Sequence, residues 1–584
     1  MTVSEYEQSM EEMEKIMNEV ASQYDIGDFD PFNLAEAYRQ WCEAMLKNPE
    51  KVIETGMAYW QDTMKLYHQS AMMMMGLDSD PVIREEEGDR RFRHQAWHEQ
   101  PVFNTIKQSY LLTSRCFRDL ASNVEGIDRQ TARKVAFFTE QYIDSLSPTN
   151  FAVTNPEVLE KTLETKGQNL VSGFQNMLAD LKKGKGKLKI SMTDTDAFEL
   201  GKNVATSPGK VVYRNRMFEL LQYEPSSKTV NTIPMLIVPP WINKYYVLDL
   251  QPRNSLIKWL VDKGHTVFVI SWVNPDESYQ DVRFDHYVTD GLVSAVDAVV
   301  AATGEESVNA IGYCIGGALL ATGVAYMKAG GDERINSATF LTTMLDYSEP
   351  GELGVFTDEE QLEGMKEKMS EKGYLEGDHM AGVFNMLRAN DLIWSFYVNN
   401  YLLGKSPKPF DLLYWNSDST RMPASMHSWY IKNFYVDNKL REPNGVSIDG
   451  IGVDLSKIDI PTCFVSTLED HIAPWKSTYA GTQLVSGQVK FILSGSGHIA
   501  GIVNPPADKK YNYRTTSEPP ADLEKWFEQA EVKRGSWWPE WQRWISRKCG
   551  KKVPARIPGD GKLDVIEDAP GSYVRVRLDD GDNP

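Results

Sequence analysis

The chain has few cysteines, only five among 584 residues. No two of them form a CxxC pair or another close spacing typical of a metal site or a redox motif. An odd number of widely spaced cysteines in a long chain argues against a disulfide framework. We therefore expect reduced thiols and a cytoplasmic protein. The five are Cys42, Cys116, Cys314, Cys463 and Cys549.

An excess of positive charge is also missing, since the formal net charge is −20 at pH 7. Binding to a phosphate backbone needs clustered lysine and arginine, so we expect no nucleic-acid partner. The histidines, cysteines and acidic residues show no spacing typical of metal ligands, and we expect no metal. The longest stretch without charge, residues 308–327, contains Asn309 and several glycines, so we expect no transmembrane segment.

The first twenty residues are acidic where a signal peptide would be basic. Apolar residues recur there at helical spacing, and Ser4 and Glu7 are placed as a capping box. We predict an amphipathic helix in this segment.

The hydrophobic pattern divides the chain into three parts. Residues 1–190 show helical spacing almost throughout, which predicts a helical N-terminal domain. It ends in the lysine- and glycine-rich stretch 181–189, interpreted as a solvated linker rather than an anion-binding patch. Residues 191–555 alternate short apolar runs with helix-length segments, and residues 556–584 form a tail rich in glycine, aspartate and proline with one short strand.

The apolar runs of the central part read as strands of an α/β fold. The first, "GKVVYRNRMFELLQYEP", alternates and fits an edge hairpin. The later runs are continuously apolar, as in parallel strands covered on both faces, and predict a doubly wound sheet. They are at 234–240, 265–272, 307–314, 337–343, 461–467 and 489–495. Strand-like apolar runs are missing from about residue 350 to 440. The aromatic-rich helices expected there predict a cap inserted over the carboxyl edge of the sheet.

A nucleophile elbow is indicated by "IGYCIGGALLATG", residues 311–323, which has the pattern Gly-x-nucleophile-x-Gly. Small neighbours are needed there because the strained strand-to-helix turn exposes the central side chain. Cys314 in that turn would face the positive end of the next helix, which favours the thiolate. The alternative is a structural cysteine packed among glycines.

The residues that follow have the order expected of such a site, namely nucleophile, acid and base. Asp470 comes just after the strand at 461–467, and His498 just after the strand at 489–495. Both would lie at the carboxyl edge beside Cys314. Glu469 competes with Asp470 for the acid role, and His471 is interpreted as an auxiliary group or a structural donor.

An oxyanion hole needs two N–H groups near the nucleophile. One is expected from Ile315, directly after Cys314. The other is expected from Trp241 or Ile242 in the loop "VPPWINKYY", where prolines fix the backbone. Trp241 could instead serve only in packing.

Seven stretches together resemble the polyhydroxyalkanoate synthases, over about residues 90–575. The helical N-terminal domain and the length are similar to class I enzymes, which act without a different catalytic subunit. The resemblance implies an α/β-hydrolase fold, with Cys314 as nucleophile, Asp470 as acid and His498 as base. The stretches are "GYCIGG", "VPPWINKYYVLDLQP", "GHTVFVISWVNPD", "FDLLYWNSDSTRMP", "EDHIAPW", "SGHIAGIVNPP" and "GSWWPEW".

The family's activity implies polymerisation of (R)-3-hydroxyacyl-CoA, with 3-hydroxybutyryl-CoA as the expected substrate and release of CoA. A cysteine suits this reaction because one thioester replaces another and the acyl group stays activated. His498 would generate the thiolate. Either His498 or Asp470 would deprotonate the attacking hydroxyl. CoA enters as part of the substrate, so no separate cofactor is expected.

The resemblance also implies further substrate contacts. Arg388 is expected near the CoA entrance, where it could pair with a phosphate, or it forms a structural ion pair. Asn438 is assigned to the substrate channel, and Ala500 to the acyl pocket. The aromatic cap would exclude water, open for substrate and rest in a closed form.

Partners and location follow from the same resemblance. We expect a homodimer in the cytoplasm, at the surface of polymer granules, with granule-coat proteins nearby.

Two other functions stay open. One is a different α/β-hydrolase, such as a thioesterase, an esterase or a polyester depolymerase, and the other is a catalytically inactive granule scaffold. Acyl chain length and the state of the isolated protein, monomer or dimer, are not decided by the sequence.

Overall fold

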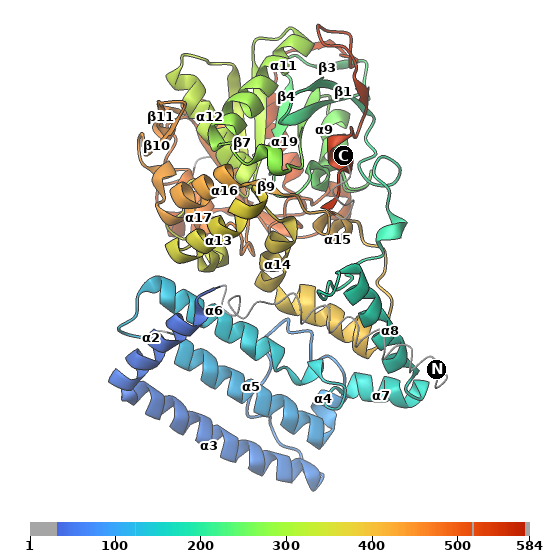
Figure 1. Ribbon diagram of the computed structural model, residues 1–584, viewed down its shortest axis with the longest axis vertical. Coiled ribbons are helices and arrows are strands. Elements are labelled where there is room, and N and C mark those ends of the chain that lie inside the picture. Colours follow the sequence, from blue (N-terminus) through green and yellow to red (C-terminus); the bar gives the residue numbers. More distant parts are fainter. Residues whose placement is uncertain (1–31, 123, 517–518, 579–584) are drawn as a thin grey trace. The chain divides into compact units, whose positions relative to one another are not determined.

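The computed structural model describes residues 32–578 apart from residues 123 and 517–518 (Figure 1). The amphipathic helix expected near the amino terminus lies outside these residues. The chain forms two compact units. A helical unit comprises Met1–Asp194 and Val383–Lys408, and a sheet unit comprises Thr195–Gly382 and Pro409–Pro584.

The helical unit confirms the predicted helical pattern in the part of it that the structure describes. Its helices start with residues that suit helix N-termini: the Asp128 side chain accepts from the N–H groups of Gln130 and Thr131, and proline opens three of the helices. In this unit α3 packs along α5, and α2 packs against α6. The helices are α2 (Leu34–Lys47), α3 (Pro49–Met74), α4 (Ala96–Glu99), α5 (Pro101–Ala121), α6 (Arg129–Ser145), α7 (Pro156–Thr165) and α8 (Gln168–Lys183).

The segment Val383–Lys408 belongs to the helical unit, although the sequence placed it in one cap at 350–440. It contains the π-helices η8 (Asn390–Trp394) and η9 (Tyr397–Leu402), and η9 packs on α8. Tyr401 donates to Asp180 Oδ2 at 2.6 Å, buried. The units therefore divide the expected cap, because the partners of this segment lie more than 200 residues earlier in the chain.

The sheet unit is built on one mixed sheet of eleven strands. Six central strands, in the order β5-β4-β6-β7-β12-β13, are parallel, which confirms the doubly wound α/β prediction. The predicted hairpin is β1–β2, and the carboxyl-terminal tail adds β17 beside β1. The strands are β1 (Gly209–Arg214), β2 (Phe218–Tyr223), β4 (Met235–Val238), β5 (Val267–Trp272), β6 (Val308–Tyr313), β7 (Ile335–Leu341), β12 (Thr462–Thr467), β13 (Val489–Ser494), β14 (Asn512–Thr515), β15 (Glu531–Arg534) and β17 (Glu567–Asp568).

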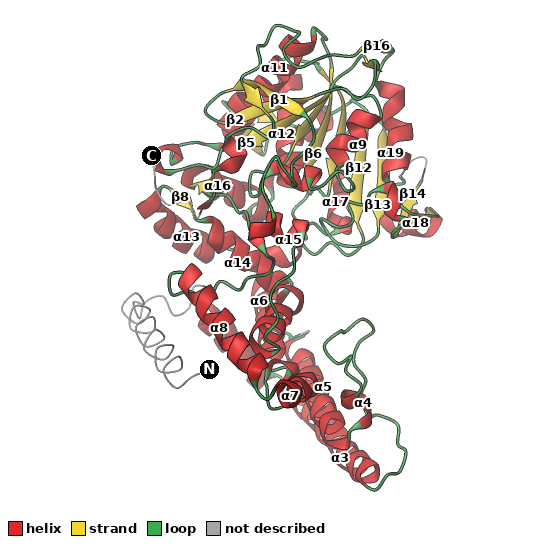
Figure 2. Ribbon diagram, turned by 90° about the vertical axis from the view of Figure 1, so that its right-hand side faces the viewer, coloured by secondary structure: helices red, strands yellow, loops and turns green. Residues whose placement is uncertain are grey.

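Helices cover both faces of this sheet, as Figure 2 shows. On one face α11 (Ser294–Thr303) and α12 (Ile315–Ala329) pack on side chains such as Leu236 and Phe340. On the other face α9 (Leu256–Asp262) and α19 (Trp538–Ile545) pack on neighbours such as Ile237 and Leu341. Successive residues of a strand point to opposite faces, so the continuously apolar strands fill both cores.

Cap elements of the sheet unit are α13 (Glu359–Lys372), α16 (Ala424–Tyr430) and the π-helix η10 (Ile431–Val436), while α14 (Gly377–Leu387) is divided between the two units at Gly382. Their aromatic rings pack against the sheet side: Trp429 stacks on Phe284 with ring centroids 4.9 Å apart, and Tyr430 lies edge-on to Trp241 at 5.8 Å. The part of the expected cap that belongs to the sheet unit is thus rich in aromatic contacts.

The turn from β6 into α12 lies directly against the loop after β4. A Cβ atom added to Gly316 would stand 2.3 Å from the carbonyl oxygen of Val238 and 2.6 Å from that of Pro239. Both atoms belong to the backbone, so neither can swing away. Glycine is therefore required at residue 316 for the first turn of α12 to approach the sheet.

We predict that Gly316→Ala lowers the free energy of unfolding by about 2–3 kcal/mol or more, because the added methyl group overpacks a backbone contact. Gly364→Ala is the matched control. Gly364 lies in α13 and an added Cβ meets nothing within 4 Å, so alanine should stabilise the helix by up to about 1 kcal/mol. Urea unfolding of the two variants checks this, and equal stability for both would contradict the close approach.

Candidate active site

Cys314 occupies the strained turn between β6 and α12. Its backbone has φ 53° and ψ −122°, in a region that non-glycine residues rarely adopt. The Cys314 N–H donates to Leu341 O at 2.9 Å, and the Cys314 carbonyl accepts from Gly317 N at 2.9 Å. The side chain is half-buried. This is the geometry of a nucleophile elbow, in which strain at one residue presents its side chain at the carboxyl edge of the sheet.

The acidic and basic residues predicted for the site are brought together. His498 Nδ1 lies 2.8 Å from Asp470 Oδ2, and both side chains are buried. Asp470 Oδ1 accepts from the N–H groups of Ile472 and Ala473 at 3.0 and 2.8 Å. Glu469, the competing acid, is exposed. The geometry therefore selects Asp470 as the partner of His498.

The pKa of His498 is raised to about 10 despite its burial. Burial lowers the pKa because it disfavours the charged ring. The charges of Asp470 and Cys314, and hydrogen bonds to both side chains, favour the imidazolium and outweigh the burial. His498 is thus linked to Asp470 on one side and to Cys314 on the other, which is the arrangement needed to take a proton from the thiol.

Tyr313 supports this histidine from the elbow itself. Its ring stacks on the His498 ring with centroids 5.7 Å apart, and its hydroxyl donates to the His498 carbonyl at 3.4 Å. Tyr313 is the last residue of β6 and is fully buried. It holds the loop after β13 next to the nucleophile, a role that the sequence pattern did not reveal.

Three tyrosines lie near Cys314, of which Tyr347 and Tyr430 are buried and Tyr435 is half-buried. Tyr347 follows β7, and its hydroxyl lies 3.4 Å from that of Tyr430 at the end of α16. Burial raises the pKa of Tyr347, Tyr430 and Tyr435, and charge on Cys314 adds to the shift in each. Tyr430 and Tyr435 lie in the aromatic-rich segment that the sequence assigned to the cap, whereas Tyr347 was missed because nothing in the loop after β7 marks it.

The loop expected to complete an oxyanion hole is fixed by Thr420. The Thr420 hydroxyl donates to the carbonyl of Trp241 at 2.7 Å and also to that of Ile242. These bonds orient the two peptide planes beside the first turn of α12, where Ile315 follows the nucleophile. The assignment of N–H groups of Trp241, Ile242 and Ile315 to an oxyanion remains a prediction.

Two residues predicted to contact the substrate, Arg388 and Asn438, bond with other residues of the protein. Arg388 is exposed on the segment that joins the helical unit and forms an ion pair with Asp391. The amide of Asn438 is engaged, since it accepts from Tyr347 N at 2.8 Å and donates to Asp346 and Ser348.

His471 and Ala500 are half-buried neighbours of the acid and the base. Their roles toward substrate, like those of Arg388 and Asn438, stay predictions. Asn438 has a structural task as well, because it holds the loop that carries Tyr347.

Within residues 32–122, 124–516 and 519–578, no group of three histidine, cysteine or acidic residues is placed to hold a metal ion. In the same residues no helix is long and apolar enough to cross a membrane.

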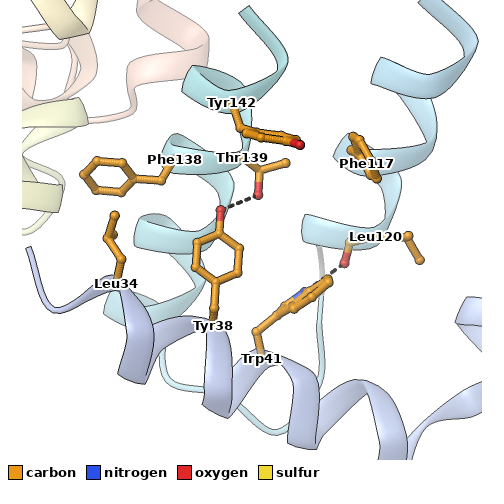
Figure 3. A pocket seen from close by; sticks show the side chains of 8 residues that line it. All are labelled: Leu34, Tyr38, Trp41, Phe117, Leu120, Phe138, Thr139 and Tyr142. Atoms are coloured by element: carbon orange, nitrogen blue, oxygen red, sulfur yellow. Dashed lines mark hydrogen bonds between the residues drawn. The ribbon is translucent and has the colours of Figure 1, made fainter. Parts of the chain in front are cut away.

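A pocket of about 410 Å³ is present in the helical unit between α2, α5 and α6 (Figure 3). Its rim is aromatic, and its polar atoms are paired: the Tyr38 hydroxyl lies 3.0 Å from that of Thr139, and Trp41 Nε1 donates to Leu120 O at 3.2 Å. It holds no acid–base pair of the kind found at Cys314.

A strained cysteine at a strand-to-helix turn, with a buried aspartate–histidine pair at the same edge of the sheet, defines an α/β-hydrolase-fold protein with a nucleophilic site. The family model described as alpha/beta hydrolase fold matches residues 233–505. A second model, Poly-beta-hydroxybutyrate polymerase (PhaC) N-terminus, matches residues 88–260.

Curated relatives match most of the chain. The poly(3-hydroxyalkanoate) polymerase of Methylorubrum extorquens is 48% identical over 92% of this chain and 88% of its own. Its counterpart from Rhizobium meliloti is 47% identical over 92% and 87%, and that from Cupriavidus necator is 41% identical over 84% and 83%. The chain belongs to the poly(3-hydroxyalkanoate) polymerase family.

We predict that the His498 ring titrates near pH 10 in the wild type and falls toward about 6.5 in Asp470→Asn, because the attraction of the carboxylate is lost. Nuclear magnetic resonance of ring-labelled histidine measures both values. His265 is an internal reference, since burial lowers its pKa to about 4 and it should stay neutral over this range. A His498 titration that is unchanged in the variant would contradict the pairing.

Proposed function

We propose that this protein is an acyltransferase that polymerises (R)-3-hydroxyacyl-CoA, with 3-hydroxybutyryl-CoA as the main substrate, into polyhydroxyalkanoate. The observation that carries the proposal is the buried Asp470–His498 pair, 2.8 Å apart, at the same sheet edge as the strained Cys314. Membership in the polymerase family supports the substrate class.

The reaction begins with acylation of Cys314. His498 takes the thiol proton, and the sulfur attacks the carbonyl carbon of the CoA thioester. The carbon–sulfur bond to CoA breaks, CoA leaves with a proton, and a new thioester links the acyl group to Cys314. One thioester replaces another, so the acyl group stays activated. N–H groups at Ile315 and in the loop of Trp241 and Ile242 would stabilise the oxyanion.

The second step makes the polymer bond. The 3-hydroxyl oxygen of another acyl unit attacks the thioester on Cys314, an oxygen ester forms and the thiol is released. After acylation Cys314 carries no negative charge, so one cause that raises the pKa of His498 disappears. A larger fraction of the imidazole is then neutral, and the neutral ring can accept the proton of the attacking hydroxyl and pass it on.

His498, rather than Asp470, is supported as the base toward the hydroxyl. Both carboxylate oxygens of Asp470 are engaged: Oδ1 with two backbone N–H groups, and Oδ2 with His498 and Thr467. Asp470 is buried behind the imidazole. Its role is to orient the ring and stabilise its positive charge, as the acid does in serine and cysteine triads.

Hydrolysis competes with polymerisation, so the site must exclude water. Tyr347 and Tyr430 are buried near Cys314, Tyr435 is half-buried beside them, and the aromatic elements of the cap pack on one another and on Trp241. Such a closed arrangement has to open to admit acyl-CoA, which makes cap opening part of each binding event. No separate cofactor is invoked, because CoA arrives with the substrate.

In the cell, we propose a cytoplasmic homodimer at the surface of polymer granules, with granule-coat proteins nearby. The product is an insoluble polyester, so a growing chain held on the enzyme would bring the enzyme to the polymer surface. Arg388 and Asn438 are proposed to contact CoA and the substrate channel, Ala500 the acyl pocket, and His471 the neighbourhood of the acid.

We predict that Cys314→Ala lowers the rate of CoA release from (R)-3-hydroxybutyryl-CoA at least about a thousandfold, because the covalent step is lost. CoA release and turbidity are followed together in the purified full chain. Cys42→Ser is the matched control, since Cys42 is another accessible thiol. It should retain both signals.

The same assay separates the alternatives. CoA release with rising turbidity supports the polymerase. Release with a clear solution and free 3-hydroxybutyrate would show a thioesterase instead. A wild type that neither releases CoA nor forms a covalent adduct with the substrate would leave the scaffold function as the better account.

A further inference from the structure

A short segment of the chain between β7 and β12 lies along the loop 238–246, which is expected to complete the oxyanion hole. We refer to this segment, residues 415–420, as the strap. Asn243 of the loop and Ser419 of the strap form an antiparallel bridge. The strap is therefore paired with the loop through the backbone, although the two are far apart in the sequence.

A buried ion pair anchors the strap to the loop. Lys244 Nζ lies 2.6 Å from Asp418 Oδ1, and their side chains are only 4% and 1% exposed. The Tyr246 hydroxyl donates to Asp418 Oδ2 at 2.8 Å, and Trp415 Nε1 donates to Lys244 O at 2.7 Å. Separating the two segments would leave a buried charge without its partner, which is costly. The loop thus has a fixed position relative to the strap.

Thr420, at the end of the strap, holds two carbonyl groups of the loop. Its hydroxyl donates to the Trp241 carbonyl at 2.7 Å and also to the Ile242 carbonyl. Its N–H donates to the Ile242 carbonyl at 3.2 Å. The peptide bond between Trp241 and Ile242 is trans, so its C=O and its N–H lie in one plane and point in opposite directions. Holding the Trp241 carbonyl therefore also sets the direction of the Ile242 N–H.

The Ile242 N–H is suited to an additional acceptor, as is the Ile315 N–H. Among the residues that the structure describes, no backbone carbonyl accepts from either group. Ile315 is buried and opens α12, where the first N–H groups have no partner within the helix. Backbone N–H groups away from water almost always have a partner. A developing oxyanion would supply one to both groups.

We propose that Thr420 is a positioning residue for acyl transfer, and that the group it positions is the Ile242 N–H. The alternative donor, the Trp241 N–H, shares its peptide plane with the Pro240 carbonyl, to which Thr420 does not bond. Thr420 acts through the loop and not on the reacting atoms. The proposal rests on the acyl transfer proposed at Cys314, but not on a polymer as the product, because a thioesterase needs the same oxyanion donors.

The same stretch of chain holds the loop through a side chain as well. Residues 421–423 join the strap to α16, and Tyr430 at the end of α16 lies edge-on to the Trp241 ring with centroids 5.8 Å apart. Thr420 holds the backbone of Trp241, and Tyr430 packs on its ring. The direction of the Ile242 N–H therefore depends on this stretch and not on the sheet alone.

The test compares loss of the Thr420 hydroxyl with its retention. Thr420→Val removes the hydroxyl at nearly constant shape, and Thr420→Ser keeps it. Thr515→Val is the matched control, since both threonines are 4% exposed and the Thr515 hydroxyl donates to the Phe491 carbonyl at 3.2 Å. Thr515 lies on β14, which does not neighbour β4. Each full-length variant is assayed for CoA release from (R)-3-hydroxybutyryl-CoA and for alkylation of Cys314 by iodoacetamide, which mass spectrometry measures.

We expect Thr420→Val to lower kcat for CoA release at least about thirtyfold and to change KM less than about threefold, because a misdirected donor weakens binding of the transition state and not of the substrate. Alkylation of Cys314 should stay within about twofold of the wild type, since displacement of iodide by the thiolate forms no oxyanion. Thr420→Ser and Thr515→Val should release CoA within about threefold of the wild-type rate.

Equal kcat values for Thr420→Val and Thr515→Val would overturn the proposal. So would a Thr420→Ser protein as slow as Thr420→Val, or a parallel loss of CoA release and alkylation in Thr420→Val, which would show general damage to the site. A wild type that is alkylated at Cys314 but releases no CoA would refute the acyl transfer itself. The two kinds of failure are therefore told apart by the wild type.

Discussion

The site depends on one close approach, that of the first turn of α12 to the loop after β4. Gly316 permits it, because a Cβ there would stand 2.3 Å from Val238 O. The approach forces Cys314 into a strained conformation with φ 53° and directs its side chain to the carboxyl edge. It also places the start of α12 against Val238 and Pro239, which directly precede Trp241. A looser turn would lose the nucleophile and the expected oxyanion donors together.

The parallel strands then supply the other two groups. β6, β7, β12 and β13 are neighbours with the same direction, so the residues that follow them meet at one edge. Asp470 and His498 stand in the loops after β12 and β13, and their burial strengthens the interaction between them. Charge on Asp470 and Cys314 overcomes the effect of burial and raises the pKa of His498. Tyr347 and Tyr430 are buried near Cys314 as well, and the proposed exclusion of water would depend on them.

The helical unit is built from two parts of the chain that are far apart in the sequence. α3 packs along α5, with Gln69 and Ser70 bonded to Gln108 and Thr105. Segment Val383–Lys408 returns from the sheet part of the chain to pack on α8, where Tyr401 bonds with Asp180. The chain between the two halves of the expected cap is therefore a structural part of the helical unit.

The sequence by itself determined the strands, the elbow and the order of nucleophile, acid and base, since each is encoded in local patterns: apolar runs, small residues about Cys314, and polar residues just after strands. It left Asp470 and Glu469 in competition and missed Tyr313 and Tyr347. It also assigned Val383–Lys408 to a single cap. Those points were decided only by the tertiary structure, because they depend on which side chain is buried and which distant residue it meets. Burial selected Asp470, ring stacking engaged Tyr313, and contacts with a helix 200 residues earlier placed the segment that contains Tyr401.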